Sequence, residues 1–178
     1  MGATVNIEFL ELFKNDWFLL GDMADMFIGD HVASGNSRVV YDFTMDPKYV
    51  VKIDRGGHFD NVAEFDIWNN IPEDLKKWFA PCLRISQCGR LLIQEKTTPV
   101  QLEDLPKEIP AFFQDFKIQN WGKIGDNIVC HDYANHKFFS KDHGMMEPEW
   151  WSDTYQVRKP LLSQVLIENE SSDGDSHK

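Results

Sequence analysis

The alternation of hydrophobic and polar positions in the first half of the chain predicts a small antiparallel sheet and one helix. "RVVYDF" and "YVVKID", two runs rich in β-branched residues, flank the turn formers "MDP" and predict a hairpin. "CLRISQ" and "LLIQEK" flank a tight glycine turn and predict a second hairpin. Between them, Val62, Phe65 and Trp68 recur on one side of a helix that Asp60 or Asn61 can cap. Two hairpins with a helix between them form one mostly antiparallel unit.

The rest of the chain is organised around a third hairpin. "WGKI" and "IVCHDY" flank the turn "GDN" and predict this hairpin, while "EDLKKWF" after a proline predicts a short helix. Imperfect helical spacing near the N-terminus predicts one or two leading helices, and the polar, acidic C-terminal residues predict disorder. The resulting division is a helical extension, a sheet region, a second region that begins close to three prolines, and an acidic tail: residues 1–31, 32–96, 97–167 and 168–178.

The composition allows one ordinary domain or two small lobes that share a cleft. The chain has 178 residues, 42% of them hydrophobic, which is enough to build a core. Its 18 basic and 29 acidic residues give a net charge of -11, which disfavours binding to nucleic-acid phosphate and to anionic membranes. An acidic surface of this kind can instead meet a basic protein surface.

Cysteine usage and the absence of sorting signals predict a cytoplasmic protein. Cys82, Cys88 and Cys130 cannot all pair with one another, and none belongs to a C-x-x-C motif, which favours a reducing compartment. The N-terminal residues lack a basic start before an apolar run, so no secretory signal is expected. No stretch approaches the length of apolar sequence that spans a membrane.

Three oxygen-bearing side chains converge around the third hairpin. Its turn lies midway between Asn120 and Asp132, so antiparallel pairing brings these residues opposite each other within about one position, at roughly 5 Å between Cβ atoms. Asp115 lies on the turn that precedes the hairpin, at the same open end as Asn120 and Asp132. Carboxylate and amide oxygens are hard donors, so this set suits Mg²⁺ that holds a polyphosphate. We therefore expect phosphoryl-transfer chemistry here.

The motifs around these residues resemble those of protein kinases. "DFKIQN" resembles the kinase catalytic loop D-L-K-P-x-N, and "HDYAN" falls where those enzymes carry D-F-G. "YVVKI" resembles the V-A-I-K strand, and "VASGNSRVVY" falls at the position of the glycine-rich loop. The order of motifs matches over residues 32–134. The compact chain, with its "NWG" and "DYA" segments, is similar to kinase-like proteins encoded by bacteriophages.

The resemblance implies an α+β, two-lobed protein kinase-like fold and a role for each motif residue. The N-lobe would be a small antiparallel sheet with one helix, and the C-lobe would be helical and truncated. Asp115 would orient the attacking hydroxyl, and Lys117 would stabilise the transferring phosphoryl group. Asn120 and Asp132 would hold Mg²⁺, and Lys52 would bind the α- and β-phosphates of ATP.

The resemblance also implies further contacts to the nucleotide. Glu64, on the helix that follows the lysine strand, would be the ion partner of Lys52. The remaining candidates lie at the position of the glycine-rich loop and near the hinge between the lobes: Ser34, Gly35, Asn36, Ser37 and Glu95.

The implied function is transfer of a phosphoryl group from Mg-ATP to Ser or Thr of a host or other substrate protein. Lys117, two positions after Asp115, favours the Ser/Thr protein kinases over sugar and antibiotic kinases. The implied setting is the cytoplasm, which is the host cytoplasm if the chain is phage-encoded. An alternative is a catalytically inactive pseudokinase that binds and inhibits a host protein through an acidic, tryptophan-rich surface.

Several positions depart from the kinase pattern. The loop offers a single glycine, Gly35, so fewer backbone N–H groups are free to approach a phosphate. Phe113 and Gln114 stand where the H-R-D motif carries His and Arg, and Tyr133 and Ala134 replace the Phe and Gly of D-F-G. These departures lower the expected nucleotide affinity and argue against control by an activation-loop phosphate.

Some of these residues also have purely structural alternatives. Glu64 could complete a capping box with Asn61 instead of pairing with Lys52. Lys52 itself could guard a strand edge against aggregation. His131 and Asp132 form the "HD" dipeptide of metal-dependent phosphohydrolases, but the β character of the preceding "NIVC" favours a packed core histidine.

The aromatic C-terminal part leaves two possibilities open. Trp150 and Trp151, with Met145 and Met146, could form the core of the second region or an exposed docking patch. The periodic segment "YQVRKPLLSQVLI" follows them.

Overall fold

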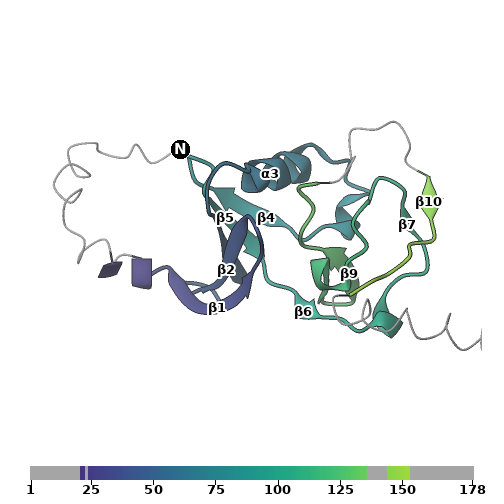
Figure 1. The fold of residues 1–178 in the computed structure, drawn as a ribbon, viewed down its shortest axis with the longest axis horizontal. Coiled ribbons are helices and arrows are strands. Elements are labelled where there is room, and N and C mark those ends of the chain that lie inside the picture. The colour runs from purple at the N-terminus through teal and green to yellow at the C-terminus, as the bar shows by residue number, and fades with distance from the viewer. Residues whose placement is uncertain (1–20, 23, 136–143, 153–178) are drawn as a thin grey trace, which may run out of the picture.

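The computed structural model of the chain describes residues 21, 22, 24–135 and 144–152. They form a mixed α+β architecture in which one α-helix, α3 (Asp60–Asn70), lies against an antiparallel sheet (Figure 1). A second region, built from short strands and 3₁₀ turns, follows this sheet along the chain and lies beside it (Figure 1). The predicted α+β class and antiparallel sheet are therefore confirmed. None of the helices in the described part of the chain has the length and apolar character needed to cross a membrane.

Five strands form the main sheet, which contains the first two predicted hairpins. Their order is β1-β2-β3-β5-β4, and every neighbouring pair is antiparallel. β3 lies in the middle, where Lys52 pairs with Val40 on one side and with Leu92 on the other. Lys52 therefore lies on a central strand, and the strand-edge alternative is wrong. The strands are β1 (Ile28–Ser34), β2 (Arg38–Phe43), β3 (Tyr49–Asp54), β4 (Cys82–Ile85) and β5 (Leu91–Glu95).

β1 begins inside the segment that the sequence predicts to be helical. The predicted helical extension runs to residue 31, whereas Ile28–Ser34 forms an edge strand. Most of β1 is exposed, and its pairing with β2 shifts register between Ile28 and Ala33. Backbone pairing with β2, and not a buried face, holds such a strand, so no alternation marks it in the sequence. Residues 1–20 of the expected extension lie outside the described residues.

α3 confirms the predicted helix, but its most deeply buried residues are not those of the predicted hydrophobic side. The helix begins after Phe59, whose φ of 58° is left-handed, and no side chain caps its first turn. The buried side consists of Asn61, Glu64 and Ile67, whereas Val62 is 41% exposed. Phe65 and Trp68 of the predicted side are partly buried against the core, but hydrophobic spacing does not indicate the fully buried positions, because two of those three residues are polar. Their partners lie on other elements, which a local pattern does not reveal.

The third predicted hairpin is confirmed, with its first strand as predicted and its second strand ending at Cys130 instead of continuing through residues 131–133. β8 (Trp121–Ile124) pairs with β9 (Asn127–Cys130), and Gly125 in the turn has a φ of 57°. β6 (Thr98–Pro99) extends this pair to three strands. β7 (Ile109–Pro110) pairs with β10 (Met145–Met146) in a separate two-stranded sheet.

The described parts of the second region, residues 97–135 and 144–152, contain no α-helix. The expectation of a helical C-lobe is therefore wrong for these residues. Three prolines, at positions 99, 106 and 110, explain the difference, because proline fixes φ and lacks the N–H that a helix interior needs. Two 3₁₀ turns occur in these residues instead, η2 (Leu102–Asp104) and η3 (Ile118–Asn120). A third, η1 (Lys76–Trp78), replaces the short helix that the sequence predicts before β4. The periodic segment and the acidic tail, residues 153–178, lie outside the described residues.

An aromatic cluster forms the core of the second region. Phe79, Phe112, Phe113, Trp121 and Tyr133 are each at most 1% exposed. The Phe79 ring lies 5.1 Å from that of Phe113 and 4.9 Å from that of Tyr133, between centroids. Trp121 lies 4.9 Å from Phe113. Because Phe79 precedes β4 and Tyr133 follows β9, the cluster ties the third hairpin to the main sheet.

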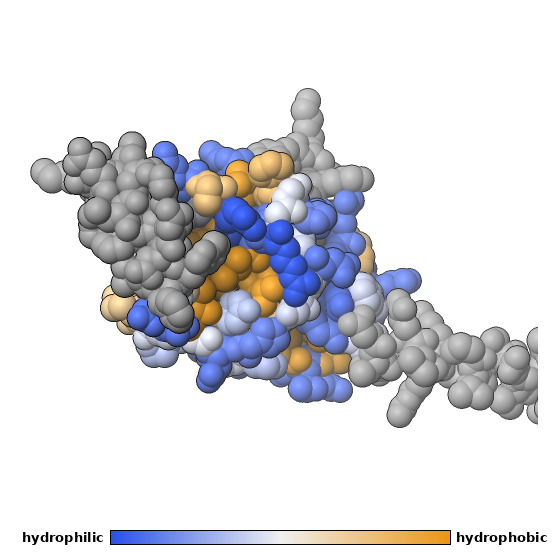
Figure 2. Space-filling model, turned by 60° about the vertical axis from the view of Figure 1, so that its left-hand side comes forward, coloured by the Kyte–Doolittle hydropathy of each residue, from blue (hydrophilic) through white to orange (hydrophobic). Residues whose placement is uncertain are grey.

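The two adjacent tryptophans near the C-terminus have different surroundings. The Trp150 ring lies edge-on to Trp121 at 5.2 Å and joins the aromatic core, as one of the two alternatives predicts. The Trp151 ring instead lies 5.4 Å from the amine of Lys117, and Met145 is 52% exposed. Other hydrophobic residues also reach the surface. Figure 2 shows a group of them in the middle of one face, surrounded by hydrophilic residues.

We predict that Gly122→Ala destabilises the junction between β6 and β8. The added Cβ would lie 2.9 Å from the carbonyl oxygen of Thr98 and closer still to the side chain of Thr97, so one strand must shift. The expected loss is about 1–3 kcal/mol in the free energy of unfolding, measured by urea denaturation. Gly35→Ala is the matched control, because only the carbonyl oxygen of Arg38 lies within reach, at 3.8 Å. Equal losses in the two variants would contradict this reasoning.

Candidate functional site

The carboxylate of Glu64 is the centre of a buried ionic network. Lys52 Nζ, from β3, lies 2.8 Å from Glu64 Oε2. Arg38 Nη2, from β2, lies 2.9 Å from Glu64 Oε1, and the backbone N–H of Tyr133 donates to the same oxygen at 3.0 Å. Lys52, Arg38 and Glu64 are at most 6% exposed. The network therefore joins two strands, α3 and the segment after β9 through side chains that are almost entirely buried.

This network excludes the alternative in which Glu64 caps its own helix. Asn61 Nδ2 donates to the carbonyl oxygens of Lys52 and Arg90, at 3.2 Å and 2.9 Å, and takes no part in a capping box. Asn61 thus fixes α3 against β3 and against the residue that precedes β5, while both oxygens of Glu64 are used by partners outside the helix.

Arg38 extends the network to Asp132. Its Nη2 donates to Asp132 Oδ1 at 2.5 Å, and the side chain of Asp132 is 47% exposed. Burial raises the pKa of Asp132, but the charges of Lys52 and Arg38 outweigh this effect and hold the pKa below its usual value. No motif in the sequence indicated Arg38. The available signal was an arginine at the start of the strand that pairs with the Lys52 strand.

His131 lies behind Lys52 as a packed histidine, as the sequence predicts. Lys52 Nζ donates to the carbonyl oxygen of His131. With its proton on Nε2, the ring donates to the carbonyl oxygen of Gln119 at 2.9 Å and accepts from the Thr97 hydroxyl at Nδ1, also at 2.9 Å. Burial and the charge of Lys52 lower the pKa of His131 to about 4. The ring is therefore uncharged at neutral pH.

Asp115, Lys117 and Asn120 lie together on the turn that precedes β8. Asp115 Oδ2 accepts from Asn120 Nδ2 at 2.8 Å, and Asp115 Oδ1 accepts from the backbone N–H of Lys117 at 3.1 Å. The backbone N–H of His131 donates to the carbonyl oxygen of Asn120 at 2.9 Å. Asn120 thus lies opposite His131, one position from Asp132, and the predicted register is confirmed.

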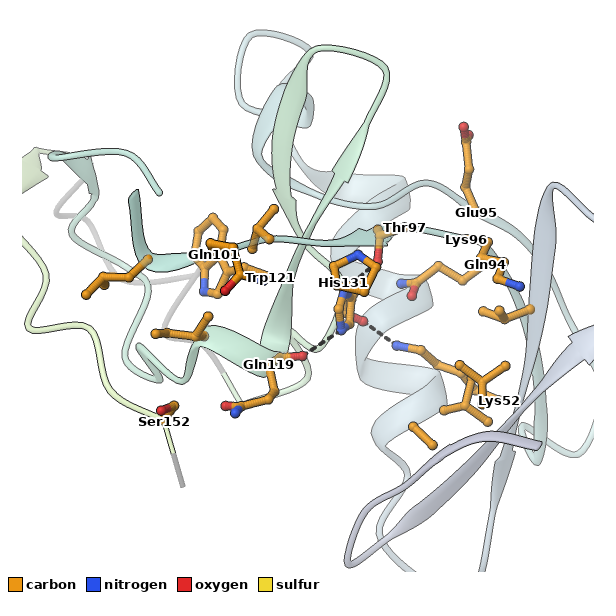
Figure 3. A pocket seen from close by; sticks show the side chains of 18 of the residues that line it. Lys52, Gln94, Glu95, Lys96, Thr97, Gln101, Gln119, Trp121, His131 and Ser152 are labelled. Atoms are coloured by element: carbon orange, nitrogen blue, oxygen red, sulfur yellow. Dashed lines mark hydrogen bonds between the residues drawn. The ribbon is translucent and has the colours of Figure 1, made fainter. Parts of the chain in front are cut away.

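A cavity of about 580 Å³ lies between the main sheet and the second region. Figure 3 shows Lys52 on the sheet side with its amine directed at His131, and Gln119 and Trp121 on the opposite side. A cavity of this size with a mixed lining is typical of a small-molecule site. Apolar side chains from β1, β2, β3 and the second region form much of its wall: Val32, Ala33, Val40, Val50, Val100, Leu102 and Ile118.

Only part of the sequence-predicted set lines this cavity. Lys52 lines it from the centre of the sheet, and Glu95 lines it from the end of β5. The other predicted residues are not among the lining side chains: Ser34, Gly35, Asn36, Ser37, Glu64, Asp115, Lys117, Asn120 and Asp132.

The loop expected to cover the nucleotide is displaced along the chain. Ser34 accepts or donates a hydrogen bond with His31 at 2.8 Å, and the hydroxyl of Ser37 donates to Asp60 at 2.5 Å. Because β1 continues to Ser34, the turn lies beyond the cavity, and residues earlier in β1 line the wall. The expectation that residues 34–37 contact the nucleotide is not supported by this placement.

The residues expected to hold Mg²⁺ already have protein partners. Asn120 donates its amide to Asp115, and Asp132 binds the guanidinium of Arg38. In the part of the chain that the structure describes, no group of three or more His, Cys, Asp and Glu side chains could hold a metal ion. Lys52 and Arg38 already compensate the carboxylates here, so the donor set lacks the surplus negative charge that a divalent cation prefers.

Comparison with known proteins adds no relative, because neither a protein-family model nor a curated protein matches the chain. The chemistry of the arrangement follows from its parts. A lysine that Glu64 orients at the wall of a cavity can bind a phosphate group, and the apolar walls can hold a planar ring.

We predict that Glu64→Ala costs more stability than Lys52→Met. Removing the carboxylate leaves the buried Lys52 without a counter-ion and Arg38 with Asp132 alone, which costs about 3–5 kcal/mol. Lys52→Met leaves Arg38 paired with Glu64, so a smaller loss in the free energy of unfolding is expected. Urea denaturation measures both variants. Glu73→Ala, which removes a surface ion pair with Lys76, is the control and should change little. A cost for Glu64→Ala no larger than for this control would contradict the network.

We predict that His131 makes the fold less stable as the pH falls from about 6.5 to about 4. The unfolded chain binds a proton at this residue in that window and the folded chain does not, so the free energy of unfolding decreases toward low pH. His131→Gln should flatten this dependence by up to about 1.4 kcal/mol per pH unit, measured by urea denaturation across the window. The exposed His58→Gln is the control. Equal slopes for wild type and His131→Gln would show that His131 is not buried in its neutral form.

Proposed function

We propose that the protein is a compact protein kinase-like domain that binds ATP and transfers its terminal phosphoryl group to Ser or Thr of another protein. The observation that carries the proposal is the buried Lys52–Glu64 ion pair, 2.8 Å long, with Lys52 at the wall of a cavity of about 580 Å³. Glu64 holds the amine in place, so Lys52 is prepared to neutralise a phosphate group. The order of the motifs from Lys52 to Asp132 supports the same conclusion.

The two ends of the cavity suit the two ends of ATP. The base occupies the part between the valines of β1, β2 and β3 and the apolar residues of the second region. Glu95, Gln101 and Thr97 at the wall offer polar groups to the base and the ribose. The polyphosphate extends toward Lys52, where the positive charge lies.

In the proposed reaction, the oxygen of a substrate hydroxyl attacks the γ-phosphorus of ATP. The bond from that phosphorus to the bridging oxygen of ADP breaks, and the hydroxyl proton passes to Asp115. Asn120 and the backbone N–H of Lys117 orient the Asp115 carboxylate by hydrogen bonds of 2.8 Å and 3.1 Å. Lys52 and Lys117 supply positive charge to the phosphates. Positioning and charge neutralisation, and not a covalent intermediate, lower the barrier.

The proposal includes a two-lobed arrangement and a setting. Residues 32–96 act as the N-lobe, and residues 97–167 act as a reduced C-lobe, whose helical turns among the described residues are η2 and η3. Such compactness is similar to that of kinase-like proteins encoded by bacteriophages. The substrate is then a cytoplasmic protein, of the host if the chain is phage-encoded.

A second candidate function is that of a pseudokinase, which binds a host protein and inhibits it without catalysis. Two contacts favour it. Arg38 already occupies one oxygen of Asp132, and the amine of Lys117 faces the ring of Trp151 at 5.4 Å. The surface that binds the partner would be acidic, in keeping with the net charge of -11, and rich in tryptophan.

We predict that Asp115→Asn abolishes transfer of radiolabelled phosphate from ATP to a Ser/Thr peptide array. An amide cannot take up the hydroxyl proton, so a loss of about 100-fold or more is expected. Asp126→Asn is the matched control, because Asp126 is an exposed carboxylate in the turn of the same hairpin and should retain full transfer.

The assay also separates the two candidate functions. Equal transfer by Asp115→Asn and wild type would contradict the role of Asp115. Wild-type protein that binds ATP but transfers no phosphate would overturn the enzyme proposal in favour of the pseudokinase.

A further inference from the structure

Arg38 is a buried cation in the place where the kinase pattern calls for a metal ion. It begins β2, pairs with Asp54 of β3 and is 6% exposed. Its Nη2 reaches both Glu64, at 2.9 Å, and Asp132, at 2.5 Å. Its Nη1 is buried without a hydrogen-bond partner among the described residues. The guanidinium therefore has one nitrogen committed to the carboxylates and another that is unsatisfied.

The charges around Asp132 leave little room for a second cation. Glu64 and Asp132 carry two negative charges, and Lys52 and Arg38 carry two positive charges within the same network. Asp60, bonded to the hydroxyl of Ser37, adds a negative charge farther out. A divalent ion bound at Asp132 would lie against the guanidinium on the same carboxylate and be repelled by it.

Displacing Arg38 would also be unfavourable. Its guanidinium would leave Glu64 and Asp132, and breaking a buried ion pair leaves uncompensated charge in the interior. A metal ion at Asp132 therefore has to overcome both the repulsion and the loss of these contacts.

We propose that Arg38 takes the place of a divalent cation at Asp132, so that nucleotide binding in the cavity does not depend on Mg²⁺. This inference rests on the proposed ATP site. Arginine is suited to the role, since its planar guanidinium is permanently charged and binds carboxylate and phosphate oxygens equally well. Lys52 lines the cavity and faces the phosphates, whereas Arg38 lies behind the wall and compensates the carboxylates of Asp132 and Glu64, so that they do not repel the phosphates.

The test is calorimetric titration of the whole chain with ATP, once with excess EDTA and once with excess MgCl₂. Wild-type protein should bind ATP with dissociation constants that agree within about threefold in the two buffers. Arg38→Gln should bind at least about tenfold more weakly in EDTA, and MgCl₂ should restore part of the affinity because Asp132 is then unoccupied. Arg55→Gln is the matched control, since Arg55 is exposed just after β3 and should behave as wild type.

Each result has a definite meaning. Wild-type binding that is more than about tenfold tighter in MgCl₂ than in EDTA would overturn the inference while leaving the ATP site intact. Binding in neither buffer would overturn the proposed function itself, and the inference with it. If thermal unfolding shows that Arg38→Gln is not folded, Arg38→Lys is compared with wild type instead. Its single ammonium cannot replace the guanidinium in full, so it should bind ATP more weakly than wild type in EDTA and recover part of the affinity in MgCl₂.

Discussion

The rest of the structure depends on how the buried carboxylate of Glu64 is neutralised. A carboxylate that is fully removed from water is tolerated only with enough partners, and here Lys52, Arg38 and the backbone N–H of Tyr133 supply them. These partners come from two strands and from the segment that follows β9. Satisfying one charge therefore fixes the positions of α3, the main sheet and the end of the third hairpin relative to one another.

The same constraint shapes the cavity. Lys52 is held from one side by Glu64 and from the other by the carbonyl oxygen of His131, so its amine stays at the cavity wall. His131 is in turn held by Thr97, just before β6, and by Gln119, in the 3₁₀ turn before β8. The contacts that stabilise the fold are thus also the contacts that hold Lys52 at the cavity wall.

The sequence predicted the elements better than it predicted their surroundings. The three hairpins and α3 follow from alternation, turn residues and helical spacing, which are local. β1 was missed because an exposed edge strand has no buried face to mark it. Arg38 was missed because its partners, Glu64 and Asp132, are distant in sequence and an arginine after a turn looks solvated. The register of Asn120 was predictable, since a hairpin turn fixes it.

The central claim is that Lys52 lies at the phosphate end of a nucleotide site. The most direct measurement uses an acyl-phosphate derivative of ATP, which transfers its acyl group to an amine beside the bound phosphates, followed by peptide mass spectrometry. The account predicts that Lys52 is acylated and that an excess of ATP prevents the reaction. Acylation confined to exposed lysines such as Lys48, or acylation of Lys52 that ATP does not reduce, would contradict it.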